Sequence, residues 1–151
     1  HSIRRRQRQM CIRDSCWERI IKEGNKLFDD AKYIEALEKY KSVLPAFKEI
    51  EELNPWLSMQ DLMELIDCYI VSCHKVSTTL AKIDGTAERV AYAYKPLYLL
   101  KAYTRELDFT EEELEFIDAR FSYSLDYYEN ALMPGNPKLA SKIVHNMRYS
   151  A

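Results

Sequence analysis

The residues of this chain best suited to metal binding or nucleophilic catalysis are Cys68, Cys73 and His74. Thiolates and imidazoles bind zinc, and a cysteine paired with a histidine is an activated nucleophile. Either chemistry requires the side chains to converge. At about 100° per residue, Cys73 and His74 lie about 140° and about 240° around a helix from Cys68, so the three side chains diverge. We therefore interpret them as buried or half-buried core residues and predict no metal site.

The sequence motifs of other catalytic and cofactor-binding sites are also absent. The sequence has no glycine-rich phosphate loop and no HExxH, GxSxG or CxxC pattern, so we predict neither catalytic residues nor a cofactor. Two acidic runs offer carboxylates for acid–base work or cation binding, but a solvated face and a helix N-terminus explain them better. These runs contain Glu49, Glu51 and Glu52, and Glu111, Glu112, Glu113 and Glu115.

The eleven tyrosines are the residues most suggestive of binding. A tyrosine combines a large apolar ring with a polar tip, which suits a binding groove. The alternative is that the rings fill the crossings between helices, and we expect about two-thirds of them to do so. The tyrosines in question are Tyr92, Tyr94, Tyr98, Tyr103, Tyr123, Tyr127 and Tyr128.

The composition is typical of one domain with a substantial core. The chain has 151 residues, of which 47% are hydrophobic and 30% are charged, and its formal net charge is −2. A domain that binds nucleic acid is usually strongly basic, so this charge argues against that class of partner. No stretch approaches the roughly 18 consecutive apolar residues that a membrane span needs. We predict no nucleic-acid partner and no membrane partner.

The first fifteen residues differ in composition from the rest of the chain. They are basic and glutamine-rich without helical periodicity, and no apolar segment of a secretory signal follows them. The run from Arg5 to Ser15 resembles the conceptual translation of a transposon-based sequencing adapter. We expect residues 1–15 to be a disordered, non-native leader. Without them the net charge is −6, which favours a neutral or basic partner, and three cysteines remain, which suits a cytoplasmic protein.

From Cys16 onward, apolar residues recur every three or four positions, which is the period of an amphipathic helix. Pro45 and Pro96 fall inside such stretches, so we expect the second helix to bend or split and the fourth to kink or divide into two shorter helices. Ser58 and Thr110 are the predicted caps of two further helices. The predicted fold class is all-α, with antiparallel helix pairs joined by short loops. The predicted helices span about 16–29, 33–53, 58–83, 86–107, 110–132 and 137–149.

One segment carries a family resemblance in its spacing of small and large residues. Gly24 and Ala36 are small, while Leu27, Tyr33 and Tyr40 are large. Two helices of a hairpin approach closely only where a small residue faces a large one. The pattern resembles the tetratricopeptide repeat (TPR), which has a small residue in its first helix, an aromatic at the turn, and alanine followed by an aromatic in its second helix.

The chain departs from the regular repeat in two respects. Ala31 stands at the turn, where the family usually has a glycine. The next similar segment, 67–76, is offset by 47 residues when Val71 is set against Gly24, whereas a regular repeat is offset by about 34. Tetratricopeptide domains of the immunophilin type have such extensions. The resemblance therefore implies a TPR-like α-solenoid of about three helical hairpins with degenerate repeats over 16–151.

The family binds peptides along the concave surface formed by the first helices of successive repeats. Carried over residue by residue, the resemblance puts Asn25 at the position that holds the end of a chaperone tail in some members. Ile21 stands where those members have lysine and Tyr69 where they have asparagine, so the resemblance does not extend to that ligand. The peptide-binding residues that it implies are Ile21, Asn25, Phe28, Cys68, Ser72 and Lys75.

Three functional hypotheses follow from these observations. The leading one is a small non-catalytic adaptor or scaffold that binds a peptide or helix of another protein on its concave face. The second is a structural or oligomerisation module that packs against another copy of the chain or a larger parent chain, so a homo-oligomer stays open. The third is the helical appendage of a larger protein, such as a truncated immunophilin that lacks its isomerase domain.

Overall fold

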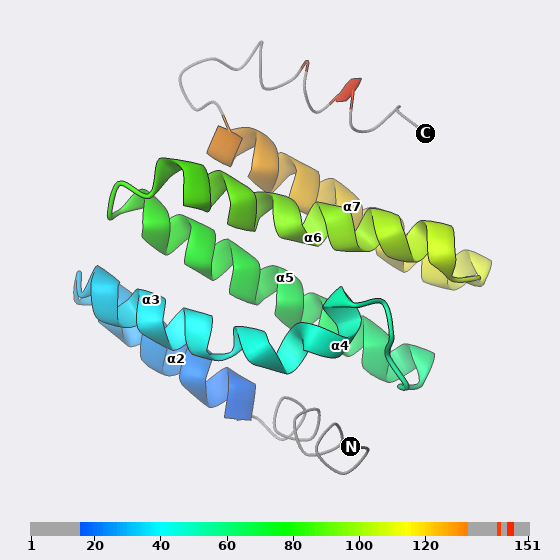
Figure 1. Cartoon of the computed structure of the whole chain (residues 1–151), viewed down its shortest axis with the longest axis horizontal. Coiled ribbons are helices and arrows are strands. Elements are labelled where there is room, and N and C mark those ends of the chain that lie inside the picture. The colour runs from blue at the N-terminus through cyan, green and yellow to red at the C-terminus, as the bar shows by residue number, and fades with distance from the viewer. Residues whose placement is uncertain (1–15, 133–141, 143–144, 147–151) are drawn as a thin grey trace.

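The protein is all-α. A computed structural model describes residues 16–132, 142 and 145–146, and no strand occurs among them. The predicted leader, 1–15, and most of the predicted last helix, 137–149, lie outside the described residues. No helix of the described part is long and apolar enough to cross a membrane. The elements are α2 (Cys16–Asp29), α3 (Tyr33–Ser42), the 3₁₀ helix η1 (Leu44–Phe47), α4 (Lys48–Glu51), α5 (Met59–Ala81), α6 (Thr86–Glu106) and α7 (Glu111–Leu132) (Figure 1).

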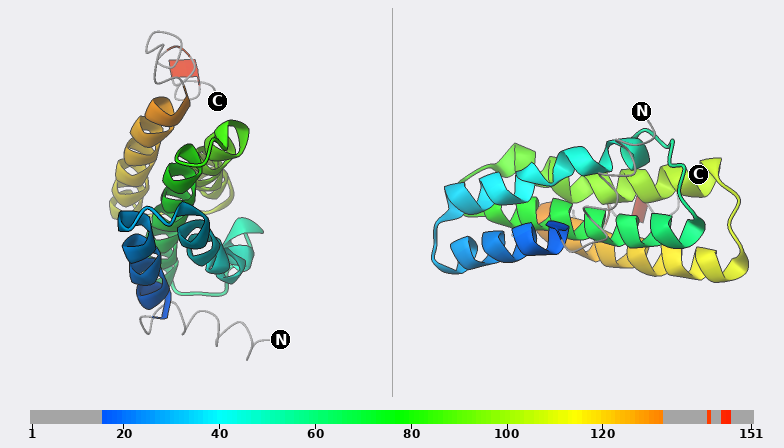
Figure 2. Two further views of the ribbon diagram at one scale, coloured as in Figure 1. Left: turned by 90° about the vertical axis from the view of Figure 1, so that its left-hand side faces the viewer. Right: turned by 90° about the horizontal axis from the view of Figure 1, so that it is seen from below.

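Helix α5 is the centre of the structure. Successive long helices pack as neighbours, α2 with α3, α5 with α6 and α6 with α7, and α3 also packs against α5. End-on, α2 and α7 lie on one side of α5, and α4 and α6 lie on the other (Figure 2). Thirteen of its residues are buried, which explains why the apolar pattern of this helix is broad rather than a narrow stripe.

The first hairpin is held by a close approach of Gly24 to Tyr40. A Cβ atom placed on Gly24 would lie 2.5 Å from Cε1 of the Tyr40 ring, well inside van der Waals contact. Tyr40 is only 1% exposed, and Ala36, one turn earlier in α3, is completely buried. The small and large residues of this segment therefore face one another, as their spacing predicted.

The predicted helix boundaries near Pro45, Ser58 and Thr110 are confirmed. The chain leaves α3 after Ser42 and passes through η1, which has Pro45 in its first turn, before α4 begins. The Ser58 hydroxyl accepts a hydrogen bond from the Asp61 backbone N–H. At the start of α7, the Thr110 hydroxyl accepts from the Glu113 N–H, and the Glu113 carboxylate accepts from the Thr110 N–H, which forms a reciprocal capping box.

Of the two outcomes predicted at Pro96, a kink or a division into two shorter helices, the division is wrong. Helix α6 runs as one element from Thr86 to Glu106 with Pro96 inside it. A proline costs the helix one backbone hydrogen bond. Pro96 is fully buried, and its neighbours Ala93 and Leu97 pack in a core cluster with Leu125 of α7. Burial against two neighbouring helices holds α6 together through the proline, because tertiary packing outweighs local propensity here.

The turn between α2 and α3 puts Ala31 in a left-handed conformation. The Lys32 N–H donates to the carbonyl of Leu27 and the Ala31 N–H donates to the carbonyl of Phe28. This is the Schellman arrangement, in which the residue after the helix adopts a left-handed conformation that favours glycine. Ala31 has φ of 60°, so it occupies a position where its Cβ is strained.

Ala31→Gly is expected to stabilise the protein by about 0.5–1 kcal/mol, because glycine relieves the left-handed strain at the cost of some chain entropy. The free energy of unfolding from urea titration measures the change. The matched control is Ala119→Gly at an exposed position inside α7, where the same substitution costs about 0.5–1 kcal/mol. If both substitutions destabilise the protein, the assigned turn conformation is wrong.

Candidate functional site

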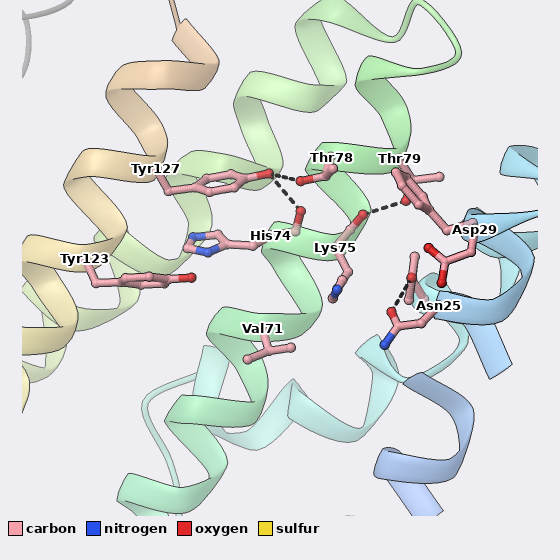
Figure 3. Close-up of a pocket in the computed structure, with 11 residues that line it drawn as sticks. Asn25, Asp29, Val71, His74, Lys75, Thr78, Thr79, Tyr123 and Tyr127 are labelled. Carbon is pink, nitrogen blue, oxygen red and sulfur yellow. Dashed lines mark hydrogen bonds between the residues drawn. The ribbon is translucent and has the colours of Figure 1, made fainter. Parts of the chain in front are cut away.

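A pocket of about 540 Å³ lies where α2, α5 and α7 face one another (Figure 3). This volume is within the range of small-molecule and side-chain pockets. Its walls come from helices that are far apart in the sequence, with one residue from α3. The lining residues are Asn25, Phe28, Asp29, Tyr40, Val71, His74, Lys75, Thr78, Thr79, Tyr123 and Tyr127.

The structure brings three of the six predicted peptide-binding residues into this pocket. Asn25 and Phe28 are on α2, and Lys75 is on α5. All three are half-buried, and Figure 3 shows the Asn25 and Lys75 side chains on the same side of α5. An uncharged amide, an aromatic ring and an ammonium group thus meet on one surface.

The other three predicted residues do not line the pocket. Ile21 is 6% exposed and belongs to the main core, and Cys68 is half-buried against that core. The Ser72 hydroxyl accepts a hydrogen bond of 2.8 Å from the Trp17 indole N–H and donates one of 2.7 Å to the Cys68 carbonyl. Helices α2 and α5 are linked at this point, so Ile21 and Ser72, which the resemblance placed on an open surface, are buried instead, and Cys68 is partly covered.

The amide of Asn25 is fixed by a residue of the first hairpin. The Tyr40 hydroxyl donates a hydrogen bond of 2.5 Å to Asn25 Oδ1. Burial raises the pKa of Tyr40 to about 12, so this hydroxyl stays protonated and remains a donor. Because the carbonyl oxygen of the amide is engaged, its NH₂ group is the part of Asn25 available to a bound molecule.

The α7 wall of the pocket is aromatic. The His74 and Tyr127 rings stack with centroids 3.8 Å apart and planes 10° apart, and Tyr123 lies 5.5 Å from His74 by the same measure. The Tyr127 hydroxyl donates to the His74 backbone carbonyl at 2.8 Å and shares a hydrogen bond with the Thr78 hydroxyl. These contacts join α7 to α5 and hold the ring of Tyr127 in place.

Sequence reasoning found the tyrosines of this wall but not the residues that they contact. It singled out Tyr123 and Tyr127 as binding candidates but gave them no partner, and it treated His74 only as a core residue. The available signal was spacing: Tyr123 and Tyr127 are four residues apart, as are Val71 and Lys75, so each pair shares one helix face. Only the packing of α7 against α5 shows that the two faces meet.

The arrangement suits binding better than catalysis. Burial lowers the pKa of His74 to about 4, and its two ring nitrogens have no hydrogen-bond partner among the described residues, so no nucleophile is activated by this imidazole. Burial also raises the pKa of the Cys68 thiol to about 11 and of the Cys73 thiol to about 12, which keeps both protonated. In the described ranges, no three His, Cys, Asp or Glu residues are grouped as a metal site requires.

Comparisons with known proteins add no relative to this description. No family model, curated protein or solved structure matches the chain.

His74→Phe is expected to remove a pH dependence of stability. The pKa of His74 is about 4 in the folded protein, against an ordinary value of 6.5. As the pH falls from 6.5 towards 4, the unfolded chain takes up a proton that the folded chain excludes. The stabilisation by neutral His74 is therefore complete above pH 6.5 and is lost as the pH falls through this range, by on the order of 2 kcal/mol.

The measurement is the free energy of unfolding of the wild type and of His74→Phe. It is taken from urea titrations between pH 7.5 and pH 4, at pH values about half a unit apart. Phenylalanine retains a ring that packs against Tyr127 but does not titrate. As the pH falls, the free energy of unfolding of the variant should rise relative to that of the wild type. Parallel curves for the two proteins would contradict the burial of a neutral imidazole.

Proposed function

We propose that this chain is a non-catalytic, TPR-like protein-interaction module, an adaptor or scaffold that binds a peptide or helix of another protein in the pocket between α2, α5 and α7. The observation that carries the proposal is the convergence of Asn25, Lys75 and Tyr123 from three separate helices on one pocket. In the TPR-like arrangement that we propose, α2, α5 and α7 are the first helices of successive pairs, and these are the three helices that line the pocket.

The exposed parts of the pocket suit a peptide with a large apolar side chain. Val71 is 37% exposed and Tyr123 is 61% exposed, so two apolar surfaces face the solvent next to polar groups. Buried aromatic contacts at the centre of an interface supply most of its affinity. The NH₂ group of Asn25 and the ammonium of Lys75 are donors, so they suit the carbonyl or carboxylate oxygens of the peptide.

A second candidate function, an oligomerisation module, is favoured by a separate aromatic surface on α6. Tyr94 is 40% exposed and Tyr98 is 59% exposed, and their ring centroids lie 6.4 Å apart. Exposed aromatic pairs are typical of interfaces between proteins. This surface belongs to a different helix from the pocket, so a pair of matched variants separates the two functions.

The free cysteines bear on where such a module works. Cys16, Cys68 and Cys73 carry free thiols, and none of the three is paired in a disulfide. Free thiols suit the reducing conditions of the cytoplasm, which is the compartment that we propose. The alternative that the chain is the helical part of a larger protein is compatible with the same compartment. The pocket then provides that larger protein with its peptide-binding site.

The proposal is tested by selecting peptides from a displayed random library on the purified chain. The selected peptides are then synthesised and their affinities for the chain are measured. Tyr123→Ala is expected to weaken binding of the selected peptides about tenfold or more, as loss of a buried aromatic contact does. Tyr98→Ala is the matched control, because it removes an equally exposed tyrosine outside the pocket. Asn25→Ala and Phe28→Ala are less suitable, since Asn25 bonds Tyr40 and Phe28 packs on the core.

Two results would contradict the peptide-binding proposal. One is a selection that enriches no peptide above background, and the other is a set of peptides whose affinity is the same for wild type and Tyr123→Ala. A mass by light scattering that rises with concentration in the wild type but not in Tyr98→Ala would instead support the oligomerisation module.

A further inference from the structure

A second pocket lies on the opposite side of α5 from the first. Its volume is about 520 Å³, and it is bounded by α3, η1, α4, α5 and α6. Tyr69 and Cys73 contribute from α5, and each is two residues from Val71, which is about 200° around a helix. The two pockets are therefore separate. The lining residues are Lys41, Leu44, Pro45, Lys48, Glu51, Tyr69, Cys73, Tyr92 and Lys95.

Three lysines from three different elements surround this second pocket, although the chain from Cys16 onward is acidic. Two of them are gathered by one aromatic ring. Lys95 Nζ lies 5.0 Å from the centroid of the Tyr92 ring, and Lys41 Nζ lies 5.6 Å from it. Both distances are within the range of a cation–π contact, so the Tyr92 ring keeps two positive charges near each other that would otherwise repel.

The negative charges around the second pocket are already engaged. Glu51 accepts a hydrogen bond of 3.0 Å from the buried Tyr69 hydroxyl. Glu88 pairs with Lys41 at 2.7 Å, and Glu52 lies 3.9 Å from Lys48; both pairs are exposed.

Exposed pairs of this kind contribute about 0–1 kcal/mol, so an anionic ligand can compete for these lysines. Lys95 forms no ion pair with any carboxylate in the described part of the chain. The positive charge available to a ligand is therefore concentrated at Lys95, and Lys41, which also lines the pocket, adds to it when a ligand replaces Glu88 as its partner.

We propose that the second pocket binds a small organic phosphomonoester, with the phosphate held by Lys95, Lys41 and Lys48 and the organic group against Leu44, Pro45 and Tyr92. The three ammonium groups around the pocket favour phosphate, which carries two negative charges, over a singly charged carboxylate. Lysine ammonium groups act as point charges that suit a dianion with oxygens in several directions.

Titration calorimetry of the full chain with phenyl phosphate tests this inference, at a pH of about 7.5 where the ligand is a dianion. Lys95→Gln is expected to weaken binding about tenfold, which corresponds to the loss of one charge-assisted hydrogen bond. Lys26→Gln on α2 is the matched control, since it removes the same charge from an exposed helix position outside this pocket. The control should bind phenyl phosphate with the affinity of the wild type.

Two further ligands sharpen the result. Benzoate offers a ring and a single carboxylate charge, and it is expected to bind at least about tenfold more weakly than phenyl phosphate. A phosphotyrosine peptide tests whether the phosphate belongs to a small molecule or to a protein. Binding equal to or weaker than that of phenyl phosphate supports a small molecule. Binding more than about tenfold tighter overturns the small-molecule ligand in favour of a phosphorylated protein. A failure to bind phenyl phosphate, or equal binding by Lys95→Gln, overturns the site.

Discussion

The close contact between Gly24 and Tyr40 links the fold to the candidate binding pocket. Because Gly24 has no side chain, the Tyr40 ring lies directly against α2, and its hydroxyl reaches Asn25 Oδ1 at 2.5 Å. The ring is almost completely buried in the main core, so its position is fixed by packing. One tyrosine therefore sets both the separation of the first two helices and the orientation of a pocket amide.

The central helix α5 positions the two outer helices, α2 and α7, that line the first pocket. Besides apolar packing, polar contacts link it to the outer helices: Trp17 of α2 donates to Ser72, and Arg120 of α7 forms two hydrogen bonds with Asp67 at 2.9 and 3.2 Å. Hydrogen bonds constrain direction as well as distance. Fixing α2 and α7 on α5 in this way leaves the pocket open between them and the second pocket on the far side of α5.

Local sequence signals predicted the elements more completely than the site. Capping residues such as Ser58 and Thr110 act over one turn, so the helix starts were readable, whereas the continuity of α6 through Pro96 depends on packing against α5 and α7. Of the residues that the resemblance singled out, Asn25 and Lys75 line the pocket, but Ser72 is covered because Trp17 hydrogen-bonds to it. Which side of a helix is covered by another helix is a property of the tertiary structure, and spacing along one helix cannot supply it.

The most direct test of the account is to map a selected peptide on the isotope-labelled chain by NMR. The account predicts that the amide signals shifted by the peptide come from three segments far apart in the sequence, around Asn25 in α2, Lys75 in α5 and Tyr123 in α7. Signals around Lys95 and Tyr98 in α6 should stay in place. Shifts that concentrate in α6, or that are confined to one of the three segments, would contradict a binding pocket formed jointly by α2, α5 and α7.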